Sequence, residues 1–213
     1  PIWIHCKGYL VRNDNMKPLY MIGCVNEIGE RQKADNVSGL LGESGFREYM
    51  NQLDTPLETG YLFRIGIDHF KEINDNFGQE YGDFVLKKTA ECISGCLSEG
   101  QRVYKLVADE FLILDASSDE TKDADKLYDK VREAIDRFIE TNEFKVMYTV
   151  SGGIVPFAAL KGNQYAEALK LTDFALNEAK KLGRNRCYIF NGETYRKFLR
   201  KREITQELRE AVI

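Results

Sequence analysis

The hydrophobic residues of this chain switch between the spacing of strands and the spacing of helices. Alternating or continuous apolar runs predict strands at residues 2–12, 18–26, 61–67, 102–106, 110–114, 144–155 and 186–190. Apolar residues three and four positions apart predict a helix from Asn36 that stops before Pro56, and helices at residues 70–77, 81–97, 123–140, 165–181 and 192–213. Gly152 and Gly153 are expected to interrupt the strand at residues 144–155.

From residue 61 onward the predicted order is β-α-α-β-β-α-β-α-β. The strands at 102–106 and 110–114 are joined by a short turn, so they should pair antiparallel. The intervening helices would cover the faces of the sheet. The sequence therefore predicts an α/β (α+β) domain with a ferredoxin-like, mostly antiparallel central sheet flanked by helices.

The first two strands form a predicted hairpin around Asn13-Asp14-Asn15, followed by a polar linker. A two-stranded hairpin is marginally stable by itself. The chain also begins with Pro1 inside a strand pattern, without an initiator methionine. We expect a piece of a longer protein with a further body upstream.

Composition narrows the possible functions. The chain has 213 residues, 43% of them hydrophobic, which is enough for one sizeable core, and a net charge of −4 argues against binding duplex nucleic acid. The sequence contains neither an apolar run of about 18 residues nor a signal peptide, so we expect no membrane segment in this chain and a cytoplasmic location. The five scattered cysteines suggest no disulfide framework, and Cys92 and Cys96 are better explained as packing residues than as a metal pair.

Four motifs occur in a recognisable order. They are Ile67-Asp68-His69-Phe70-Lys71-Glu72-Ile73-Asn74-Asp75, Gly78-Gln79-Glu80-Tyr81-Gly82-Asp83, Lys105-Leu106-Val107-Ala108-Asp109-Glu110-Phe111 and Ala175-Leu176-Asn177-Glu178-Ala179-Lys180-Lys181-Leu182-Gly183-Arg184-Asn185. From about Asp35 to Phe190 the chain resembles the GGDEF domains of diguanylate cyclases, with the two signature glycines replaced by Val107 and Ala108.

The resemblance implies a fold related to adenylyl cyclase catalytic domains and three segments. Residues 1–30 would be the end of a PAS-like sensor domain, residues 31–191 the GGDEF domain, and residues 192–213 a connector helix of the kind that precedes EAL domains. It also implies a chemistry. Two facing domains, expected as a homodimer, each hold one GTP, and the 3′ hydroxyl of one attacks the α-phosphate of the other to form cyclic di-GMP. This reaction needs a divalent cation, Mg²⁺, to neutralise phosphate charge.

The implied metal site is incomplete. The family's metal-binding aspartate falls at Gly66, which has no side chain, and Asp68 lies about 6–7 Å further along the strand. Asp109 is the other metal carboxylate, and Glu110 can serve as a supporting acid or ligand. The resemblance thus implies Asp109 and Glu110 as catalytic residues and Asp109 with, weakly, Asp68 as metal ligands. The plainer interpretation of Asp68 is a turn or cap carboxylate before the helix at residues 70–77.

The replaced glycines should affect the signature turn. Glycine permits positive φ and close backbone approach to a nucleotide. A β-branched residue at positive φ is an outlier, so Val107 is expected to change the shape of the turn or the position of GTP. An ordinary hairpin turn is the alternative.

The residues that match the family's nucleotide-binding positions are less altered than the metal site and the signature turn. Asn74 and Asp83 match the residues that contact guanine, and a carboxylate can accept both N1–H and N2–H of that base. Phe70 and Lys71 open a helix whose free N–H groups suit an anion. Lys180 and Arg184 match triphosphate contacts. Each match has a plainer alternative. Asn74 would belong to a turn, and Asp83 would be an acidic residue at the N-terminus of a helix. Lys180 and Arg184 would be basic residues at a helix C-terminus, where the helix dipole favours them.

These observations predict a degenerate GGDEF domain that has lost cyclase activity and regulates through GTP binding or dimerisation, with Mg²⁺ present only if the domain is active or GTP-bound. Two alternatives are an active cyclase, in which Asp68 or Glu110 compensates for Gly66, and a dimerisation module without a ligand. The inhibitory Arg-x-x-Asp motif of many active members is replaced by Ser98-Glu99-Gly100-Gln101, so product feedback through it is not expected.

Overall fold

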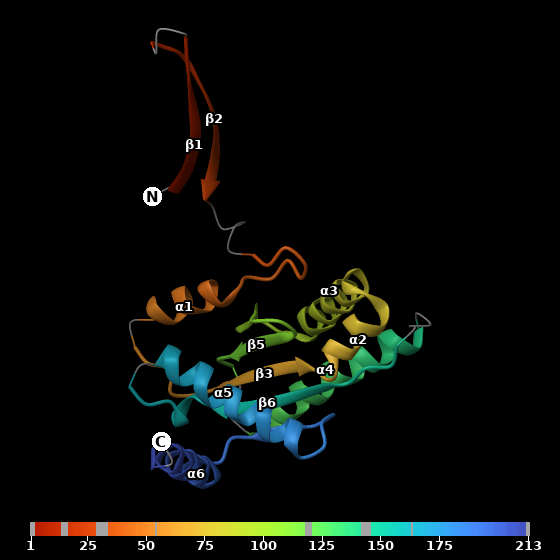
Figure 1. Cartoon of the computed structure of the whole chain (residues 1–213). Helices are drawn as coiled ribbons and strands as arrows, with labels where there is room; N and C mark the ends of the chain where they lie inside the picture. Colours follow the sequence, from red (N-terminus) through yellow and green to blue (C-terminus); the bar gives the residue numbers. More distant parts are fainter. Residues whose placement is uncertain are drawn as a thin grey trace.

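The computed structural model describes residues 3–13, 17–28, 34–53, 55–117, 121–141, 146–162 and 164–211. The elements follow in the order β1 (Trp3–Arg12), β2 (Pro18–Ile28), α1 (Glu43–Asn51), β3 (Tyr61–Ile67), α2 (Phe70–Phe77), α3 (Gln79–Cys96), β4 (Gln101–Lys105), β5 (Glu110–Asp115), α4 (Thr121–Thr141), β6 (Val150–Pro156), the 3₁₀ turn η2 (Phe157–Ala159), α5 (Gln164–Lys181), β7 (Cys187–Ile189) and α6 (Gly192–Ala211) (Figure 1).

Five strands form one sheet in the order β4-β5-β3-β6-β7. Neighbouring strands are antiparallel except β6 and β7, which are parallel. The mostly antiparallel, ferredoxin-like sheet predicted from the sequence is confirmed. β1 and β2 pair antiparallel as a separate two-stranded sheet, which confirms the predicted strand pairing, whereas Asp14 and Asn15 of the predicted turn lie outside the described residues.

The two faces of the sheet bury separate clusters of side chains. Phe63 and Ile65 of β3 pack with residues of α2, α3 and α4, whereas Leu62 packs with residues of α1 and α5. Figure 1 shows α5 running across the sheet near β3 and β6. Because side chains alternate along a strand, the even-numbered residues 62, 64 and 66 of β3 face α5. This face carries the candidate site.

The helix predicted from Asn36 begins only at Glu43. Upstream, the carboxylate of Asp35 accepts hydrogen bonds from the N–H and the hydroxyl of Ser38, both at 2.7 Å. Gly39 has a φ of +72°. A side chain that binds the backbone a few residues ahead offers an alternative to the helix, so this segment forms a turn.

The predicted strand at residues 144–155 begins only at Val150, and its residues 144 and 145 lie outside the described part. The expected interruption at Gly152 and Gly153 is wrong, because β6 pairs with β3 through both residues. A Cβ on Gly152 would lie 2.7 Å from the Tyr128 ring, and one on Gly153 would lie 2.3 Å from the backbone nitrogen of Leu176. These glycines therefore permit close packing of α4 and α5.

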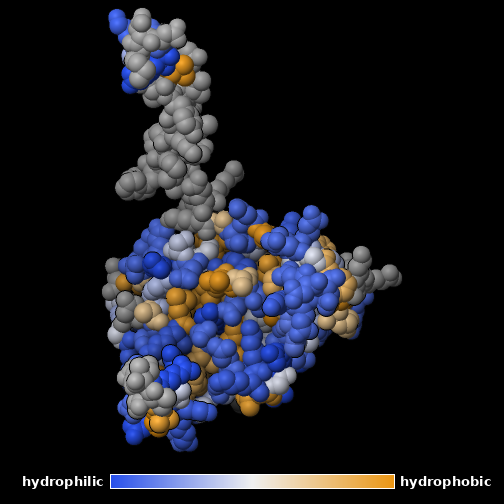
Figure 2. Space-filling model, viewed as in Figure 1, coloured by the Kyte–Doolittle hydropathy of each residue, from blue (hydrophilic) through white to orange (hydrophobic). Residues whose placement is uncertain are grey.

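The helix α6 packs against α5 through aromatic side chains. The rings of Tyr195 and Phe198 lie 4.9 and 5.1 Å from that of Phe174 in α5. Further along, Ile204 and Leu208 are exposed. None of the helices within the described ranges is both long and apolar enough to span a bilayer. Figure 2 shows a mainly hydrophilic surface on the face viewed, with hydrophobic residues between the polar ones.

Candidate functional site

The candidate site lies where β3 ends and β5 begins. Gly66 and Glu110 are paired across these two antiparallel strands. The helix α5 crosses above them, and a Cβ on Gly66 would lie 3.0 Å from Nζ of Lys180. The position at which the resemblance implies a metal-binding aspartate therefore faces an ammonium group.

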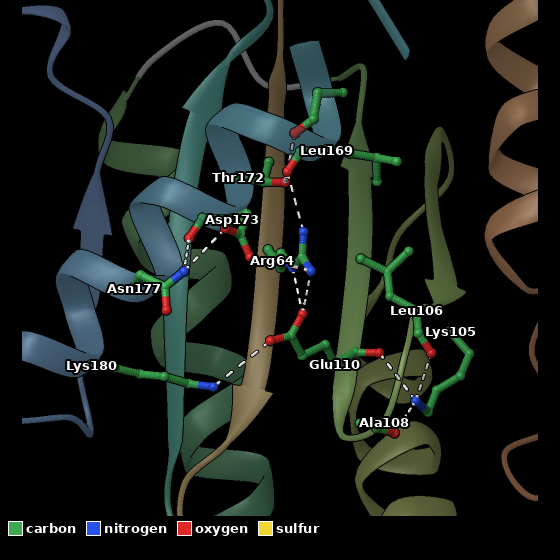
Figure 3. A network of polar contacts seen from close by, with 11 residues as sticks. Arg64, Lys105, Leu106, Ala108, Glu110, Leu169, Thr172, Asp173, Asn177 and Lys180 are labelled. Carbon is green, nitrogen blue, oxygen red and sulfur yellow. Dashed lines mark hydrogen bonds and ion pairs between the residues drawn. The ribbon is translucent and has the colours of Figure 1, made fainter. Parts of the chain in front are cut away.

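The carboxylate of Glu110 is held by two cations. Nε and Nη2 of Arg64 lie 2.6 and 2.5 Å from its Oε2, and Nζ of Lys180 lies 3.8 Å from its Oε1. Figure 3 shows Arg64 reaching Glu110 from β3 while Lys180 approaches from α5. The side chains of Arg64 and Glu110 are 14% and 18% exposed, so this ion pair is largely shielded from water.

Arg64 also binds the helix above it. Its Nη1 donates to the carbonyl of Leu169 at 3.2 Å, and its Nη2 lies 3.5 Å from Oδ1 of Asp173. A buried guanidinium needs several partners to offset the loss of its hydration. These contacts fix its position and direction.

A third cation, Lys105, binds backbone carbonyls of the signature turn. Lys105 is buried, and its Nζ donates to the carbonyls of Leu106 at 2.9 Å and Glu110 at 3.4 Å, and also to the carbonyl of Ala108. Burial lowers the pKa of Lys105. The ammonium thus takes the place of water as the hydrogen-bond donor to these carbonyls.

The turn forms in spite of both glycine replacements. Ala108 takes the positive φ, 55°, whereas Val107 is not among the described residues with positive φ. The N–H of Glu110 donates to the carbonyl of Val107 at 3.2 Å, and the Val107 side chain is 72% exposed. The turn thus closes with Ala108 at positive φ and the β-branched Val107 outside that region, and the expected effect on the position of GTP stays a prediction.

Asp109, in this turn, is half-buried. Burial raises the pKa of its carboxyl group, and the nearby Lys180 opposes that rise. Its carbonyl accepts a hydrogen bond from the N–H of Ile67 at 3.3 Å, which ties the turn to the end of β3.

Asp68 is a buried anchor, 2% exposed. Its carboxylate accepts hydrogen bonds from the hydroxyls of Thr149 and Ser151, both at 2.7 Å, and from the N–H of Asn185 at 3.1 Å. It does not cap α2, whose N-cap position is His69, with no side-chain cap bond. The carboxylate joins the start of β6 to the loop after α5.

These residues do not fit a divalent metal. Mg²⁺ is usually bound by one or two carboxylates together with substrate phosphates. Glu110 is already paired with Arg64, Asp68 accepts three hydrogen bonds, and Asp109 has Lys180 and Lys105 beside it. Within the residues that the structure describes, no group of three or more His, Cys, Asp and Glu side chains is arranged to hold a metal.

The predicted guanine-binding residues lie on neighbouring helices. Asn74 is in α2, and Asp83 is in the early part of α3. A Cβ on Gly82 would lie 1.8 Å from Oδ1 of Asn74, so only glycine lets this amide lie against α3. That Oδ1 is buried and has no hydrogen-bond partner in the described part of the chain. An unpaired buried polar atom is unusual in a native structure.

The predicted phosphate contacts are spread out. Phe70 begins α2 and is half-buried, and Lys71 beside it is exposed. Lys180 points toward Glu110, as Figure 3 shows. Arg184 follows α5, is exposed and has a φ of 61°. The structure thus directs Lys180 into the site and leaves Lys71 and Arg184 at the surface.

Sequence reasoning missed Arg64, the turn contacts of Lys105 and the need for glycine at position 82. A signal for Arg64 was present, because it is the charged residue in the otherwise uncharged strand Tyr61–Ile67. Charged residues are rarely buried without a partner, so a counter-ion on a neighbouring element was implied. The turn contacts of Lys105 and the Gly82–Asn74 approach have no comparable signal.

The chain is similar to known proteins over most of its length. It is 28% identical over 182 residues to the cyclic di-GMP phosphodiesterase NbdA of Pseudomonas aeruginosa, covering 84% of this chain and 23% of NbdA. It is 26% identical over 189 residues to the diguanylate cyclase VdcA of Vibrio cholerae, covering 85% of this chain and 55% of VdcA. The chain therefore spans less than two thirds of either relative.

A solved structure and a family model agree with this similarity. The GGDEF domain of TpbB, also called YfiN, from Pseudomonas aeruginosa superposes with a TM-score of 0.66 at 24% identity, covering 78% of this chain and 99% of that one. This likeness supports the fold. The model of the diguanylate cyclase GGDEF domain matches residues 33–186. On this evidence the chain belongs to the GGDEF domain family of diguanylate cyclases.

Proposed function

We propose that this chain is a GGDEF domain of cyclic di-GMP signalling that has lost cyclase activity and acts by binding a guanine nucleotide. The observation that carries the proposal is the pairing of Glu110 with Arg64, beside a Gly66 that faces the Lys180 ammonium. A cyclase must neutralise charge on the reacting phosphates with metal. Here protein cations occupy that region.

The relatives support the signalling context. NbdA is named a cyclic di-GMP phosphodiesterase, and VdcA is named a diguanylate cyclase. A domain of this family without turnover would respond to nucleotide and pass the response to neighbouring domains. A PAS-like sensor before it, an EAL domain after it and assembly as a homodimer belong to the same proposal.

Guanine recognition is assigned to Asn74 and Asp83. Their positions on neighbouring helices support this assignment, because guanine offers N–H donors along one edge that an amide and a carboxylate can read together. Phosphates are assigned to Lys180 and Arg184, with Lys71 and the free N–H groups at the start of α2 beside Phe70.

Nucleotide titration by calorimetry tests the proposal. The unaltered chain should bind GTP more tightly than ATP, and Asp83→Ala should abolish that preference. Glu80→Ala is the matched control, because it removes an exposed carboxylate from the first turn of the same helix. A preference that survives Asp83→Ala would show that the base is not read here.

A cyclase assay completes the test. The chain, incubated with GTP and Mg²⁺, should make no cyclic di-GMP above a protein-free control. Product that depends on Asp109 would show an active cyclase instead. Absence of both GTP binding and product would favour the dimerisation module.

A further inference from the structure

We propose that Arg64 and Lys180 form a built-in cation pair that takes the place of the divalent metal, so that guanosine polyphosphates bind at this site without Mg²⁺. The inference rests on the proposed function, because it specifies how that same site handles phosphate charge. It assigns to Arg64 a role that neither the signature motif nor the sequence similarity suggests.

The pair is built on one face of the sheet. Arg64 and Gly66 both face α5 from β3, and Glu110 faces the same side from β5, opposite Gly66. Two Arg64 nitrogens lie within 2.6 Å of the Glu110 carboxylate, and Lys180 contacts its other oxygen at 3.8 Å. A carboxylate with both oxygens facing cations is a poor ligand for a third cation.

The two cations differ in how firmly they are held. Arg64 is fixed by Glu110, the carbonyl of Leu169 and Asp173. Lys180 has one long contact to Glu110 and a side chain that is 24% exposed. Arg64 is thus committed to Glu110 and Asp173, and Lys180, with its single long contact, is the cation of the pair that can turn toward a phosphate.

The absence of a side chain at position 66 completes the arrangement. A Cβ at Gly66 would approach Nζ of Lys180 to 3.0 Å and its Cε to 3.3 Å. An aspartate there would direct a carboxylate at this ammonium and compete with phosphate. The glycine keeps Lys180 uncommitted, and an ammonium binds phosphate as a point charge.

The arrangement predicts which nucleotide is bound. A metal-dependent site recognises the Mg²⁺ complex of GTP, whose charge is already reduced. A site that supplies positive charge through its own side chains can bind the nucleotide polyphosphate without a bound metal. We therefore expect free GTP and GDP to bind as ligands and Mg²⁺ to add no affinity.

The first experiment is calorimetric titration of GTP into the chain, with excess EDTA or with excess Mg²⁺. The unaltered chain should bind with dissociation constants that agree within about threefold under the two conditions. Arg64→Leu frees the Glu110 carboxylate, so its binding should weaken at least about tenfold in EDTA and recover in Mg²⁺. Arg64→Lys keeps the charge and should retain metal-independent binding. A tenfold or greater loss of affinity in EDTA for the unaltered chain would overturn the inference.

The second experiment needs no nucleotide. Paramagnetic resonance of Mn²⁺ should show no saturable binding to the unaltered chain, and saturable binding to the Arg64→Leu/Gly66→Asp double variant, with circular dichroism confirming that both are folded. Saturable Mn²⁺ binding by the unaltered chain would refute the cation substitution. If the chain binds GTP under neither condition of the first experiment, the guanine-nucleotide function and this inference both fail, whereas GTP binding that requires Mg²⁺ overturns this inference and leaves the proposed function standing.

Discussion

Nζ of Lys180 lies 3.0 Å from the place that a Cβ atom on Gly66 would take. This relationship joins the end of β3 to the last turn of α5. It also predicts that restoring one acidic residue will not restore a metal site. A new carboxylate at this position would meet an ammonium before it met a metal.

Gly66→Asp should therefore give a folded protein that makes no cyclic di-GMP. Gly66 is buried, and a Cβ there would lie 3.0 Å from Nζ of Lys180 and 3.3 Å from Cδ2 of Leu176, so the change should cost about 1–3 kcal/mol of stability. Thermal unfolding and product chromatography check both statements. Gly66→Ala is the control that adds the Cβ atom without charge, and cyclase activity in Gly66→Asp alone would contradict the prediction.

Adding Val107→Gly and Ala108→Gly to Gly66→Asp should also leave the chain inactive, because Arg64 still holds Glu110. Activity should need Arg64→Leu as a fourth change. Charge neutralisation and phosphate approach act together in the transition state, so the effects should be strongly non-additive. The assay should use a dimerised form of the chain, in which two sites can face each other. Product from the triple variant would show that Arg64 does not block the site.

Ala108→Gly should stabilise the domain. Ala108 has a φ of 55°, a left-handed conformation that costs an L-residue about 1 kcal/mol or more. Part of that gain is offset by the greater freedom of glycine in the unfolded chain. We expect an increase in the free energy of unfolding of about 0.5 kcal/mol in urea titrations. Val107→Gly, at a residue without positive φ, should give no increase, and an equal gain from both variants would contradict the strain argument.

Gly82→Ala should disturb the base-reading pair. The new Cβ would lie 1.8 Å from Oδ1 of Asn74, so the amide must move. We expect a loss of about 1–3 kcal/mol in stability, as for other overpacked positions, together with loss of the preference for GTP over ATP. Gly95→Ala in the same helix meets no atom within 4 Å and should be neutral or stabilising. A Gly82→Ala chain with unchanged stability and preference would rule out the close approach.

Asp68→Ala should destabilise the fold by about 3 kcal/mol, because the buried Ser151 hydroxyl and two partly buried donors lose a charged acceptor. Thr149→Val removes one of the three donors and should cost about 1 kcal/mol. Chemical unfolding measures both. If Asp68→Ala instead left stability unchanged and weakened Mn²⁺ binding, Asp68 would be a metal ligand and not an anchor.

The stability conferred by Asp109 should depend on pH. Burial raises the pKa of its carboxyl group above the unfolded value of 3.8. A raised folded pKa contributes stability below the unfolded pKa, and this contribution is lost as pH rises through the folded pKa. Asp109→Asn should therefore raise the melting temperature at about pH 7 and lose this advantage near about pH 3, where both side chains are neutral. A constant difference across this range would show that the effect is not ionisation.

The sequence predicted most of the fold because the apolar periodicity is strong in the elements that bury both faces of the sheet. It failed at the helix from Asn36, where the Asp35–Ser38 hydrogen bonds outweigh periodicity. It failed at Gly153, where a glycine signals a packing partner that is distant in sequence.

For the candidate site, the sequence pointed to Gly66, Asp109, Glu110 and Lys180. It did not predict the side chains that contact them. The interaction of Arg64 with Glu110 depends on strand register. The spacing of residues within one motif cannot predict how two strands from different motifs pair. The choice of Ala108 over Val107 for positive φ likewise depends on how the turn closes.

The network of Arg64, Glu110 and Lys180 limits which single substitutions the chain can accept on the way to a metal-binding site. Replacing Arg64 alone leaves the largely shielded Glu110 carboxylate with one distant cation, Lys180, and such a change typically destabilises a protein. Introducing an aspartate at position 66 alone ties up Lys180. Each single step toward a metal-binding cyclase passes through a less stable or less capable intermediate. The inactivity proposed above would therefore be difficult to reverse by single substitutions, because selection for a stable fold opposes each of them.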